Sequence, residues 1–462
     1  MILGRPLTAC ERKRAQHFYN LFSLVNGASY MCLGENVLIL FAVHLAAPNW
    51  VVALLGSMMF LGYFVMPLGV LRTAKVGAAR CQADFWVGRN LAALTIALSV
   101  FAERLSPGLA WGIVVAGAFL FYGFRAAGCV LSAPLIGDIA TPEETPILIS
   151  RNNGCFYLSG TAMLLAIAAL LHFSENVWML VGVIGFGAAL GITASTFIRQ
   201  INETGGVRDA ARQKLLPGIR AVFANPDIRR FAPGWFCLNM VILLVGPISV
   251  LALKRGLGFG DTPALLCSAV QFCAGFALAP VSGRICRAFG PKFMLKNFSY
   301  LYLLVAVAWV VFPPLAALRR WMVFAAGGFI SLLVGMGYIL TLNAVSSYFL
   351  MACPDKKQQV PGSISLQLIV SVGAGLLGAL ASTGLVRLAE HLAPCFGGIF
   401  AADEMGVFRL YFLAIVPVFF VCHFFIGRLR VLLYDYRARY GHDGVVRLIR
   451  LAQCWRRMMR HH

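Results

Sequence analysis

The chain has 462 residues, of which 60% are hydrophobic and 12% are charged, and its formal net charge is +21. Soluble domains carry about 25% charged residues, so this chain lacks the charge that would cover a water-exposed surface. The composition therefore excludes a soluble enzyme, a disordered chain and a secreted disulfide scaffold. The apolar residues fall in blocks rather than alternating with polar ones, which argues against an outer-membrane barrel.

Twelve apolar segments have roughly the length of a membrane-spanning helix, which needs about 20 residues. They predict an all-α polytopic membrane protein with twelve transmembrane helices. In chain order the segments are Phe18–His44, Trp50–Leu71, Phe85–Phe101, Leu109–Ile136, Cys155–Leu171, Val177–Phe197, Phe231–Leu253, Ala264–Val281, Met294–Pro313, Trp321–Phe349, Ile364–Val386 and Val407–Ile426.

The basic residues indicate how these helices are oriented. With the N-terminus placed on the cytoplasmic side, 30 of the 39 lysines and arginines fall in cytoplasmic segments and 7 fall in outer loops. This asymmetry follows the positive-inside rule. The first apolar segment is a full span without a clear cleavage site, so we read it as an uncleaved anchor. We expect a protein of the cytoplasmic (inner) membrane with both termini in the cytoplasm.

The two halves of the chain show a weak internal repeat. At a shift of 213 residues, Asn26 aligns with Asn239 and Gly77 aligns with Gly290, each pair in corresponding positions of the two halves. Six helices in each half give the halves the same orientation, which makes this a parallel repeat.

This repeat sets the expected domain boundaries. The C-terminal tail has apolar residues mostly on one side and arginines on the rest. It predicts an amphipathic helix on the anionic inner leaflet, with a partner-binding helix as the alternative. We predict a first six-helix bundle, a cytoplasmic linker, a second six-helix bundle and a basic tail over residues 1–199, 200–230, 231–427 and 428–462.

One loop of the second half carries a recognisable motif between the eighth and ninth segments. It reads Gly283-Arg-Ile-Cys-Arg-Ala-Phe-Gly290-Pro-Lys292. This resembles the loop signature of the major facilitator superfamily, Gly-x-Leu-x-Asp-Arg-x-Gly-Arg-Arg, with Arg287 standing where the family usually has Asp. The resemblance implies two six-helix bundles around a central cavity. It also implies alternating access by rocking of the halves, usually coupled to an ion gradient.

Charged loops on the expected cytoplasmic side are candidate gate elements. Glycines permit tight turns between helices. Acidic loops near basic loops could hold this side shut through weak, solvent-exposed ion pairs, although a solvated charged face is the alternative. The gate candidates are Arg72, Gly77, Arg80, Asp138, Glu143, Gly283, Gly290, Lys292 and Asp355.

Few ionisable residues lie within the spans, and each is a functional hypothesis because such groups are costly in a membrane. Glu35 in the first segment and Arg125 in the fourth are the proton-coupling candidates. Arg125 could instead hold an anionic group of the substrate, and the two residues could also form a static ion pair. Arg89 is expected to extend its head group to the interface.

Other polar residues within the spans are candidates for contact with a solute. Hydrogen bonds between helices are the alternative role for each of them. The cavity candidates are Asn26, Asn36, Tyr122, Asn152, Tyr157, Asn239, Gln271, Tyr338, Asn343 and Gln367.

These patterns predict a secondary active transporter that moves a small organic solute across the cytoplasmic membrane by alternating access. Proton coupling through Glu35 is an added hypothesis. The alternatives are a lipid, lysolipid or drug translocator on the same fold, and a non-transporting membrane sensor or assembly protein. No catalytic constellation supports an enzyme. We expect a monomer with no metal, cofactor or nucleic-acid partner.

Overall fold

The computed structural model describes residues 2–47, 51, 55, 58–173, 176–259, 261–313, 319–396 and 404–433. These residues form helices and connecting turns, and the β contact found among them is an isolated bridge between Ile2 and Glu203. Helices are expected because every backbone polar group must find a partner within a membrane span.

The helices of the first half follow the predicted segments closely. They are α1 (Ala9–Leu33), α2 (Glu35–His44), the 3-10 turn η1 (Gly62–Val65), α4 (Met66–Val76), α5 (Ala78–Glu103), α6 (Pro107–Cys129), α7 (Ser132–Ile139), α8 (Thr145–Phe173) and α9 (Val177–Arg199). The linker contains α10 (Gly206–Ala211) and α11 (Leu215–Ala224).

The second half repeats this order of helices. It comprises α12 (Pro226–Leu251), the π-helix η2 (Ala252–Gly256), α13 (Asp261–Phe289), α14 (Pro291–Phe298), α15 (Tyr300–Val310), α16 (Arg320–Ala352), α17 (Lys356–Ser365), the π-helix η4 (Leu366–Val372), α18 (Gly373–Leu392), the 3-10 turn η5 (Ala393–Cys395) and α19 (Glu404–Gly427).

The predicted all-α polytopic class is confirmed. Within the described part of the chain, 11 helices are long and apolar enough to cross a membrane. The remaining predicted segment, Phe18–His44, is divided between α1 and α2 at Gly34. Together they account for the twelve predicted spans.

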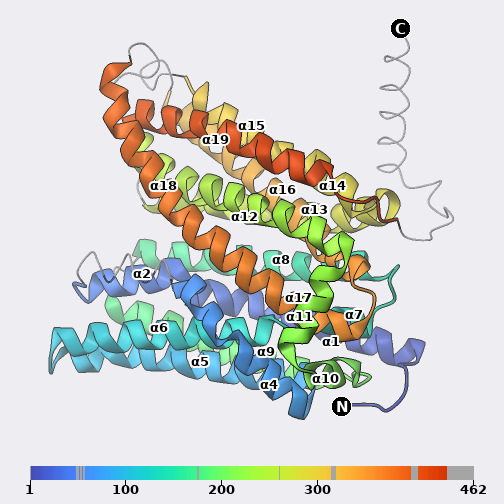
Figure 1. Cartoon of the computed structure of the whole chain (residues 1–462). Coiled ribbons are helices and arrows are strands. Elements are labelled where there is room, and N and C mark those ends of the chain that lie inside the picture. The colour runs from blue at the N-terminus through green and yellow to red at the C-terminus, as the bar shows by residue number, and fades with distance from the viewer. Residues whose placement is uncertain are drawn as a thin grey trace, which may run out of the picture.

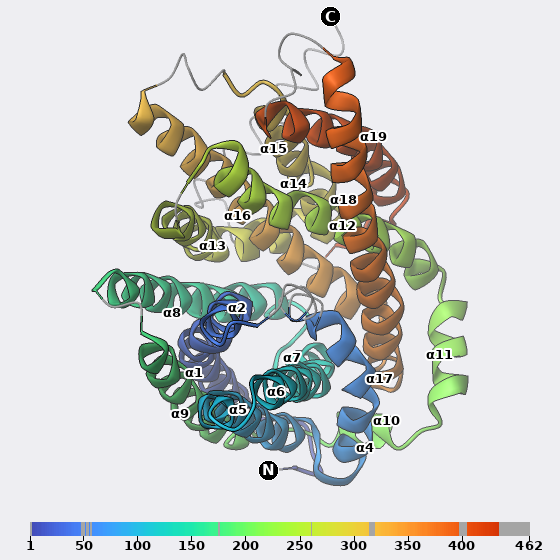
Figure 2. The same ribbon diagram turned by 90° about the vertical axis from the view of Figure 1, so that its left-hand side faces the viewer.

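The two halves form two bundles that lie against each other (Figures 1 and 2). Helices α1 to α9 make up one bundle, and α12 to α19 make up the other. The linker helices α10 and α11 lie at the same end of the bundles as the N-terminus, and we call this end the linker face. The other end, which Figure 2 shows towards the viewer, is called the opposite face.

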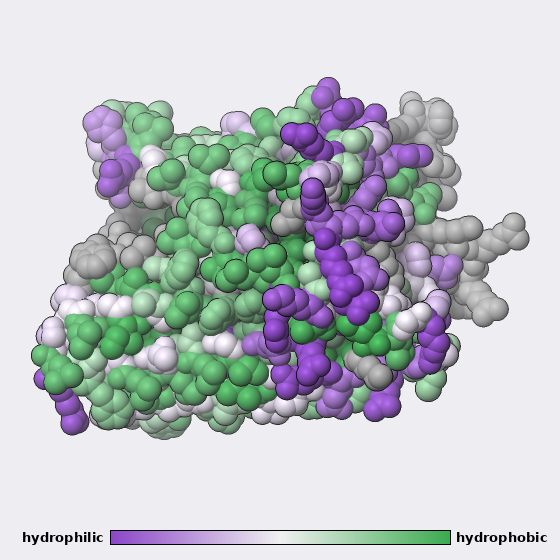
Figure 3. Space-filling model, turned by 60° about the horizontal axis from the view of Figure 1, so that its bottom comes forward, coloured by the Kyte–Doolittle hydropathy of each residue, from purple (hydrophilic) through white to green (hydrophobic). Residues whose placement is uncertain are grey.

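Apolar side chains cover the sides of both bundles. Figure 3 shows hydrophobic residues over most of the visible flank and a band of hydrophilic residues towards the linker face. Large exposed side chains such as Leu98, Phe186 and Phe329 are more than half exposed. On a soluble protein such a surface would aggregate, whereas on a membrane protein it faces lipid.

Glycines allow the helices inside each half to approach closely. In α16, a Cβ atom at Gly335 would lie 2.2 Å from the Gln271 carbonyl oxygen of α13. That distance is shorter than any normal contact, so α13 and α16 can pack this closely only around a residue without a side chain. Such contacts between small residues hold membrane helices together in the absence of a hydrophobic driving force.

We predict that Gly335→Ala destabilises the second half, because an added methyl group would force α13 and α16 apart. Overpacking typically costs about 1–3 kcal/mol, which should lower the thermal midpoint of the purified protein in detergent. Gly328→Ala is the matched control on the same helix, since nothing lies within 4 Å of a Cβ atom there. Equal midpoints for the two variants would contradict this account of the packing.

The linker is attached to the first bundle through Glu203. Its carboxylate accepts hydrogen bonds from the backbone amides of Ala78 at 2.9 Å and Ala79 at 3.3 Å, at the start of α5. Its carbonyl oxygen accepts a hydrogen bond from the Leu3 amide at 2.8 Å. Gly77 precedes α5 with φ +89°, a conformation that favours glycine. Because Glu203 is only 2% exposed, burial raises the pKa of its carboxyl group to about 7.

This raised pKa predicts a specific pH dependence of stability. The unfolded chain releases the Glu203 proton near its ordinary pKa of about 4.3, whereas the folded chain keeps the proton until about pH 7. The folded state should therefore lose stability as pH rises from about 4.5 to 7. Measured against Glu203→Gln, the thermal midpoint of the wild type should fall across that window. A midpoint difference that is constant between pH 5 and pH 8 would refute the prediction.

Candidate functional site

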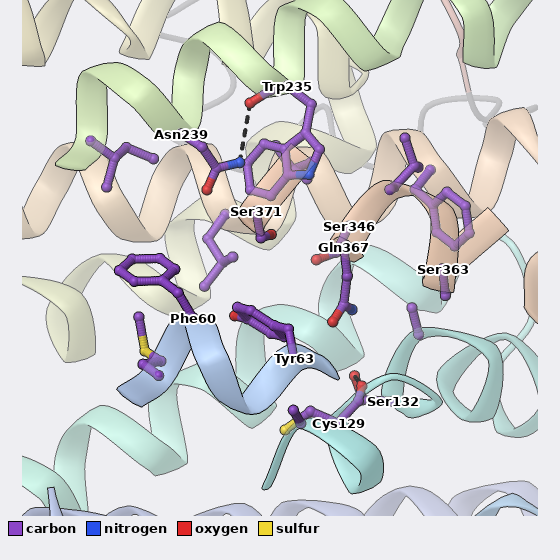
Figure 4. Close-up of a pocket in the computed structure, with 18 of the residues that line it drawn as sticks. Phe60, Tyr63, Cys129, Ser132, Trp235, Asn239, Ser346, Ser363, Gln367 and Ser371 are labelled. Atoms are coloured by element: carbon purple, nitrogen blue, oxygen red, sulfur yellow. Dashed lines mark hydrogen bonds between the residues drawn. The ribbon is translucent and has the colours of Figure 1, made fainter. Parts of the chain in front are cut away.

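A cavity lies between the two bundles near the middle of the spans (Figure 4). One lobe, of about 370 Å³, is lined by residues of both halves, and its C-half wall carries Trp235, Asn239, Gln367 and Ser371. A second lobe, of about 280 Å³, extends among α1, α5, α6 and α8. The lobes share lining residues, so we treat them as one central cavity. Shared lining residues are Arg125, Cys129, Ser132, Tyr338, Leu342 and Ser346.

The C-half wall combines aromatic and amide side chains. Asn239 donates a hydrogen bond to the Trp235 carbonyl oxygen at 3.1 Å, which holds its amide in place on α12. Gln367 and Ser371 lie in η4, a π-helix that interrupts the span between α17 and α18. A π-helix changes the direction of successive side chains, and such interruptions occur frequently at functional sites.

The N-half wall is ordered by a tryptophan. Trp86 of α5 donates a hydrogen bond through Nε1 to Oδ1 of Asn26 in α1 at 2.8 Å. The Trp86 ring also makes an edge contact with Phe22, with ring centroids 5.3 Å apart. Asn26, Trp86 and Phe22 all line the second lobe. The result is a wall with one fixed amide and several aromatic faces.

Arg125 of α6 provides the positive charge of the cavity lining. Its guanidinium lies over the Tyr30 ring, 5.2 Å from the ring centroid. Tyr63 and Tyr338 line the cavity beside it. Among the residues that line the two lobes there is no carboxylate within the described part of the chain. A cation in a membrane span without a nearby acid is costly, so its retention points to a ligand or a structural role.

The expectation for Arg89 is wrong. Instead of reaching the interface, Arg89 is fully buried inside the first bundle. Its guanidinium stacks over Trp86 at 4.8 Å and Phe121 at 5.3 Å, and Nη2 donates to Ser29 Oγ at 3.3 Å. Aromatic faces attract cations. The rings of Trp86 and Phe121 therefore stabilise the Arg89 guanidinium inside the bundle, where the sequence had suggested that it reaches the interface.

The sequence-derived cavity candidates fall into three groups: those that line the cavity, those that lie elsewhere, and those whose side chains are not described. Gln271 and Asn343 do not line either lobe, and Tyr122 is buried in the packing of the first bundle. The side chains of Glu35 and Asn36 lie outside the described residues. Those that line the cavity are Asn26, Arg125, Asn152, Tyr157, Asn239, Tyr338 and Gln367.

Polar side chains join the halves beside the cavity. Asn153 of α8 donates a hydrogen bond to Asn343 of α16, with a donor–acceptor distance of 2.6 Å. Asn343 in turn donates to Ser282 of α13, and Ser150 of α8 donates to the Ala279 carbonyl oxygen. The polar atoms of Asn343 are thus engaged by other residues, which explains why it does not line the cavity.

Small residues let α8 and α13 meet along these hydrogen bonds. A Cβ atom at Gly283 would lie 2.6 Å from Ser150 Cβ, and one at Gly154 would lie 3.1 Å from Ala279 Cβ. Gly275 similarly faces the Tyr157 ring. These contacts lie in the part of α8 nearer the linker face, so the halves are closed together on that side.

An ion pair crosses between the halves at the linker face. Arg287, at the end of α13, lies 3.5 Å from Glu143 in the loop before α8. Arg287 stands where the family loop signature usually has Asp, and it pairs with one of the acidic gate candidates. The Glu143 side chain is half exposed, so the pair contributes at most about 1 kcal/mol.

The other gate candidates make contacts within one half or with the linker. Arg72 pairs with Asp84 at 2.8 Å, and Asp138 accepts a hydrogen bond from the Thr204 amide at 2.6 Å. Asp355 caps α17 by accepting from the Lys357 amide at 2.9 Å. Lys292 donates to the Leu429 carbonyl oxygen.

Arg80 and Gly290 are the two remaining gate candidates. Arg80 is exposed on the first turn of α5. Gly290 has φ +80° at the turn before α14, which explains why a glycine stands at this position of the loop motif.

Sequence reasoning missed several residues that shape the cavity. Trp86, Trp235 and Tyr63 line the cavity, and none of them was a candidate from the sequence. Asp84 was not singled out, yet it binds both Arg72 and Arg199 at 2.8 Å. An acid at the start of an apolar segment, between basic loops, was the signal that could have identified it.

Solved structures with a similar arrangement of helices are transporters. The proton:xylose symporter XylE bound to 6-bromo-6-deoxy-D-glucose gives a TM-score of 0.63 at 10% identity, covering 92% of this chain and 98% of that chain. The E. coli fucose:proton symporter FucP gives a TM-score of 0.63 at 10% identity, covering 92% and 99%. The human organic anion transporter MFSD10 gives a TM-score of 0.55 at 16% identity, covering 89% and 99%.

The chain has the major facilitator superfamily fold. No protein-family model matches the sequence, and no curated protein matches it.

We predict that Glu143→Gln loosens the linker face, because it removes one partner of the ion pair with Arg287. An exposed pair is worth about 0–1 kcal/mol, so labelling of Cys129 by a water-soluble thiol reagent from the linker face should speed up by at most about fivefold. Cys129 is a suitable reporter because it lines both lobes.

Arg5→Gln is the matched control, since it breaks the Arg5–Glu11 pair at 2.8 Å within the first half. The double variant Glu143→Gln/Arg287→Gln should show less than the sum of the two single effects. Fully additive effects would mean that the pair does not hold the two halves together.

Proposed function

We propose that this protein is a secondary active transporter that moves a small organic solute by alternating access. The observation that carries the proposal is the central cavity, which is lined by both halves and contains Arg125, Asn239 and Gln367. A cavity of a few hundred Å³ with a few polar groups among aromatic side chains is typical of a small-molecule site. By their titles, the similar solved structures described above are two sugar:proton symporters and an organic anion transporter.

The contacts between the halves suggest how the cavity changes sides. The linker face is closed by the α8–α13 interface and by the Glu143–Arg287 pair. The cavity is therefore expected to open towards the opposite face in this state. For the reverse state the halves rock, the hydrogen bond between Asn153 and Asn343 breaks, and the exposed ion pair separates at little cost.

Proton coupling through Glu35 is a further part of the proposal. The motivation is its position within a span, where a carboxyl group changes its affinity for a proton as its surroundings change. XylE and FucP are proton symporters by their titles. Solute accumulation driven by a proton gradient in proteoliposomes should be lost in Glu35→Gln, and unchanged accumulation would remove this role.

The location is proposed from the charge distribution. The multi-pass membrane character follows from the spans, and the excess of basic residues at the linker face supports a cytoplasmic assignment for that face under the positive-inside rule. The polar groups of the cavity lining, which are Arg125, Asn239 and Gln367 among others, favour a solute over the alternatives of a lipid, lysolipid or drug translocator or a non-transporting sensor.

Alternating access predicts that Cys129 is reachable from both faces of the membrane, in turn. An impermeant thiol reagent added to one side of oriented vesicles should label Cys129 from either face, as measured by peptide mass spectrometry with Cys129→Ala as the blank. A disulfide between Gly154→Cys and Ala279→Cys would hold α8 against α13, because the Cβ positions lie 3.1 Å apart and need to separate by only a few tenths of an ångström to reach the usual distance across a disulfide. The locked protein should lose labelling from the linker face and keep it from the opposite face.

Reduction of that disulfide should restore labelling from both faces. The double variant before oxidation is the reference, because Gly154→Cys by itself places a side chain in the close contact between α8 and α13. Labelling from one face only, both before locking and after reduction, would contradict alternating access and favour a sensor with a fixed pocket.

A further inference from the structure

We propose that the transported solute is an organic anion whose carboxylate or phosphate group binds Arg125. The proposal rests on the transporter function proposed above and names its substrate class. It is carried by the charges around the cavity and by the geometry of the arginine.

The first observation is the imbalance of charge in the cavity. Arg125 lines both lobes, and none of the carboxylates that the structure describes lines either lobe. The described ion pairs lie in loops and at the ends of the bundles, and Arg125 takes part in none of them. A guanidinium in a low-dielectric interior that has no acidic partner among the described residues attracts an anion strongly.

The second observation is the way in which Arg125 is held. Tyr30 covers it with a ring face at 5.2 Å, the Tyr63 hydroxyl shares a hydrogen bond with it, and Tyr122 is a further polar neighbour. A cation–π contact uses the face of the guanidinium plane and leaves the N–H groups at its edge for hydrogen bonds. An oxyanion with two acceptor oxygens fits this edge in a bidentate manner, as arginine commonly binds carboxylate and phosphate.

A second arginine, Arg89, adds to the positive potential of the cavity although it lies outside the lining. Arg89 stacks on Trp86, which itself lines the cavity, and Arg89 interacts electrostatically with Arg125. Two nitrogens of Arg89, Nε and Nη1, have no hydrogen-bond partner within the described residues. The Arg89 charge is therefore weakly compensated, and its field reaches the Arg125 site through protein rather than water.

The remaining lining indicates the rest of the solute. The C-half wall facing Arg125 offers the Trp235 ring, the Asn239 and Gln367 amides and the Ser371 hydroxyl. An anion with a polar or aromatic body would contact Arg125 with its charged end and these groups with its body. It would bridge the two halves, and its charge would compensate Arg125 when the cavity closes around it.

The electrostatic part of the proposal can be tested with the native thiol of Cys129, four residues after Arg125 on α6. The test compares the labelling rates of an anionic reagent, sulfonatoethyl methanethiosulfonate, and a cationic one, trimethylammonioethyl methanethiosulfonate. The rate with the anionic reagent divided by the rate with the cationic reagent reports the local electrostatic potential, because the fraction of thiolate affects both reagents equally. In the wild-type protein, this ratio for Cys129 should be about tenfold or more above the ratio for 2-mercaptoethanol, a free thiol in solution.

Variants of Arg125 test whether this residue is the source of the local potential at Cys129. Arg125→Gln should lower the ratio by about tenfold, whereas Arg125→Lys should largely keep it because the charge remains. Arg220→Gln is the matched control, since Arg220 is exposed on the linker helix α11 outside the cavity, and it should leave the ratio unchanged. A wild-type ratio no higher than that of the free thiol, or one insensitive to Arg125→Gln, would overturn the proposal.

Ligand protection then tests the substrate class with pairs that differ in charge: gluconate and glucose, benzoate and benzamide, phenyl phosphate and phenol. An anion of a pair should slow labelling of Cys129 by uncharged methyl methanethiosulfonate more than its neutral partner does. This protection should vanish in Arg125→Gln and persist in Arg220→Gln. Protection by glucose that is independent of Arg125 would refute the anion assignment while leaving transport intact, because two-sided accessibility of Cys129 tests transport separately.

Discussion

The structure depends on one constraint: inside the bilayer there is no water to satisfy a polar group, so each one must find a partner within the protein. The backbone meets this constraint by forming helices. The side chains meet it in small clusters, such as Trp86 with Asn26 and Asn153 with Asn343. Where the described residues leave a charge without an opposite charge, as at Arg125, the interior carries a cost that a bound solute can offset.

The contact between the halves follows from the same constraint. Without a hydrophobic driving force in lipid, helices associate through close packing and a few hydrogen bonds. Gly154, Gly275 and Gly283 bring α8 and α13 together at the linker face, and the Ser150–Ala279 hydrogen bond lies among them. Such an interface is specific in shape and can separate without exposing a large apolar core to water. This property suits a protein whose halves must move relative to each other.

The structure places only some of the residues that the sequence suggested for the cavity at its lining. Asn26 and Asn239, which align in the two halves, both line the cavity. Tyr122 shares a helix face with Arg125 in sequence, yet it packs inside the first bundle. A rotation of one helix by a fraction of a turn decides which residue faces the centre, and spacing along the chain does not determine that rotation. Arg89 was misplaced for a related reason, because the aromatic partners Trp86 and Phe121 come from packing.

The sequence by itself determined the class, the number of spans and the order of the two halves, because apolar length and composition are local properties of the chain. It also supplied the loop motif that indicated the fold. Only the tertiary structure decided which polar residues meet in one cavity, that Arg287 pairs with Glu143 across the halves, and that Arg89 lies buried behind Trp86. These are contacts between segments distant in the chain, set by how helices rotate and approach, and no local pattern specifies them.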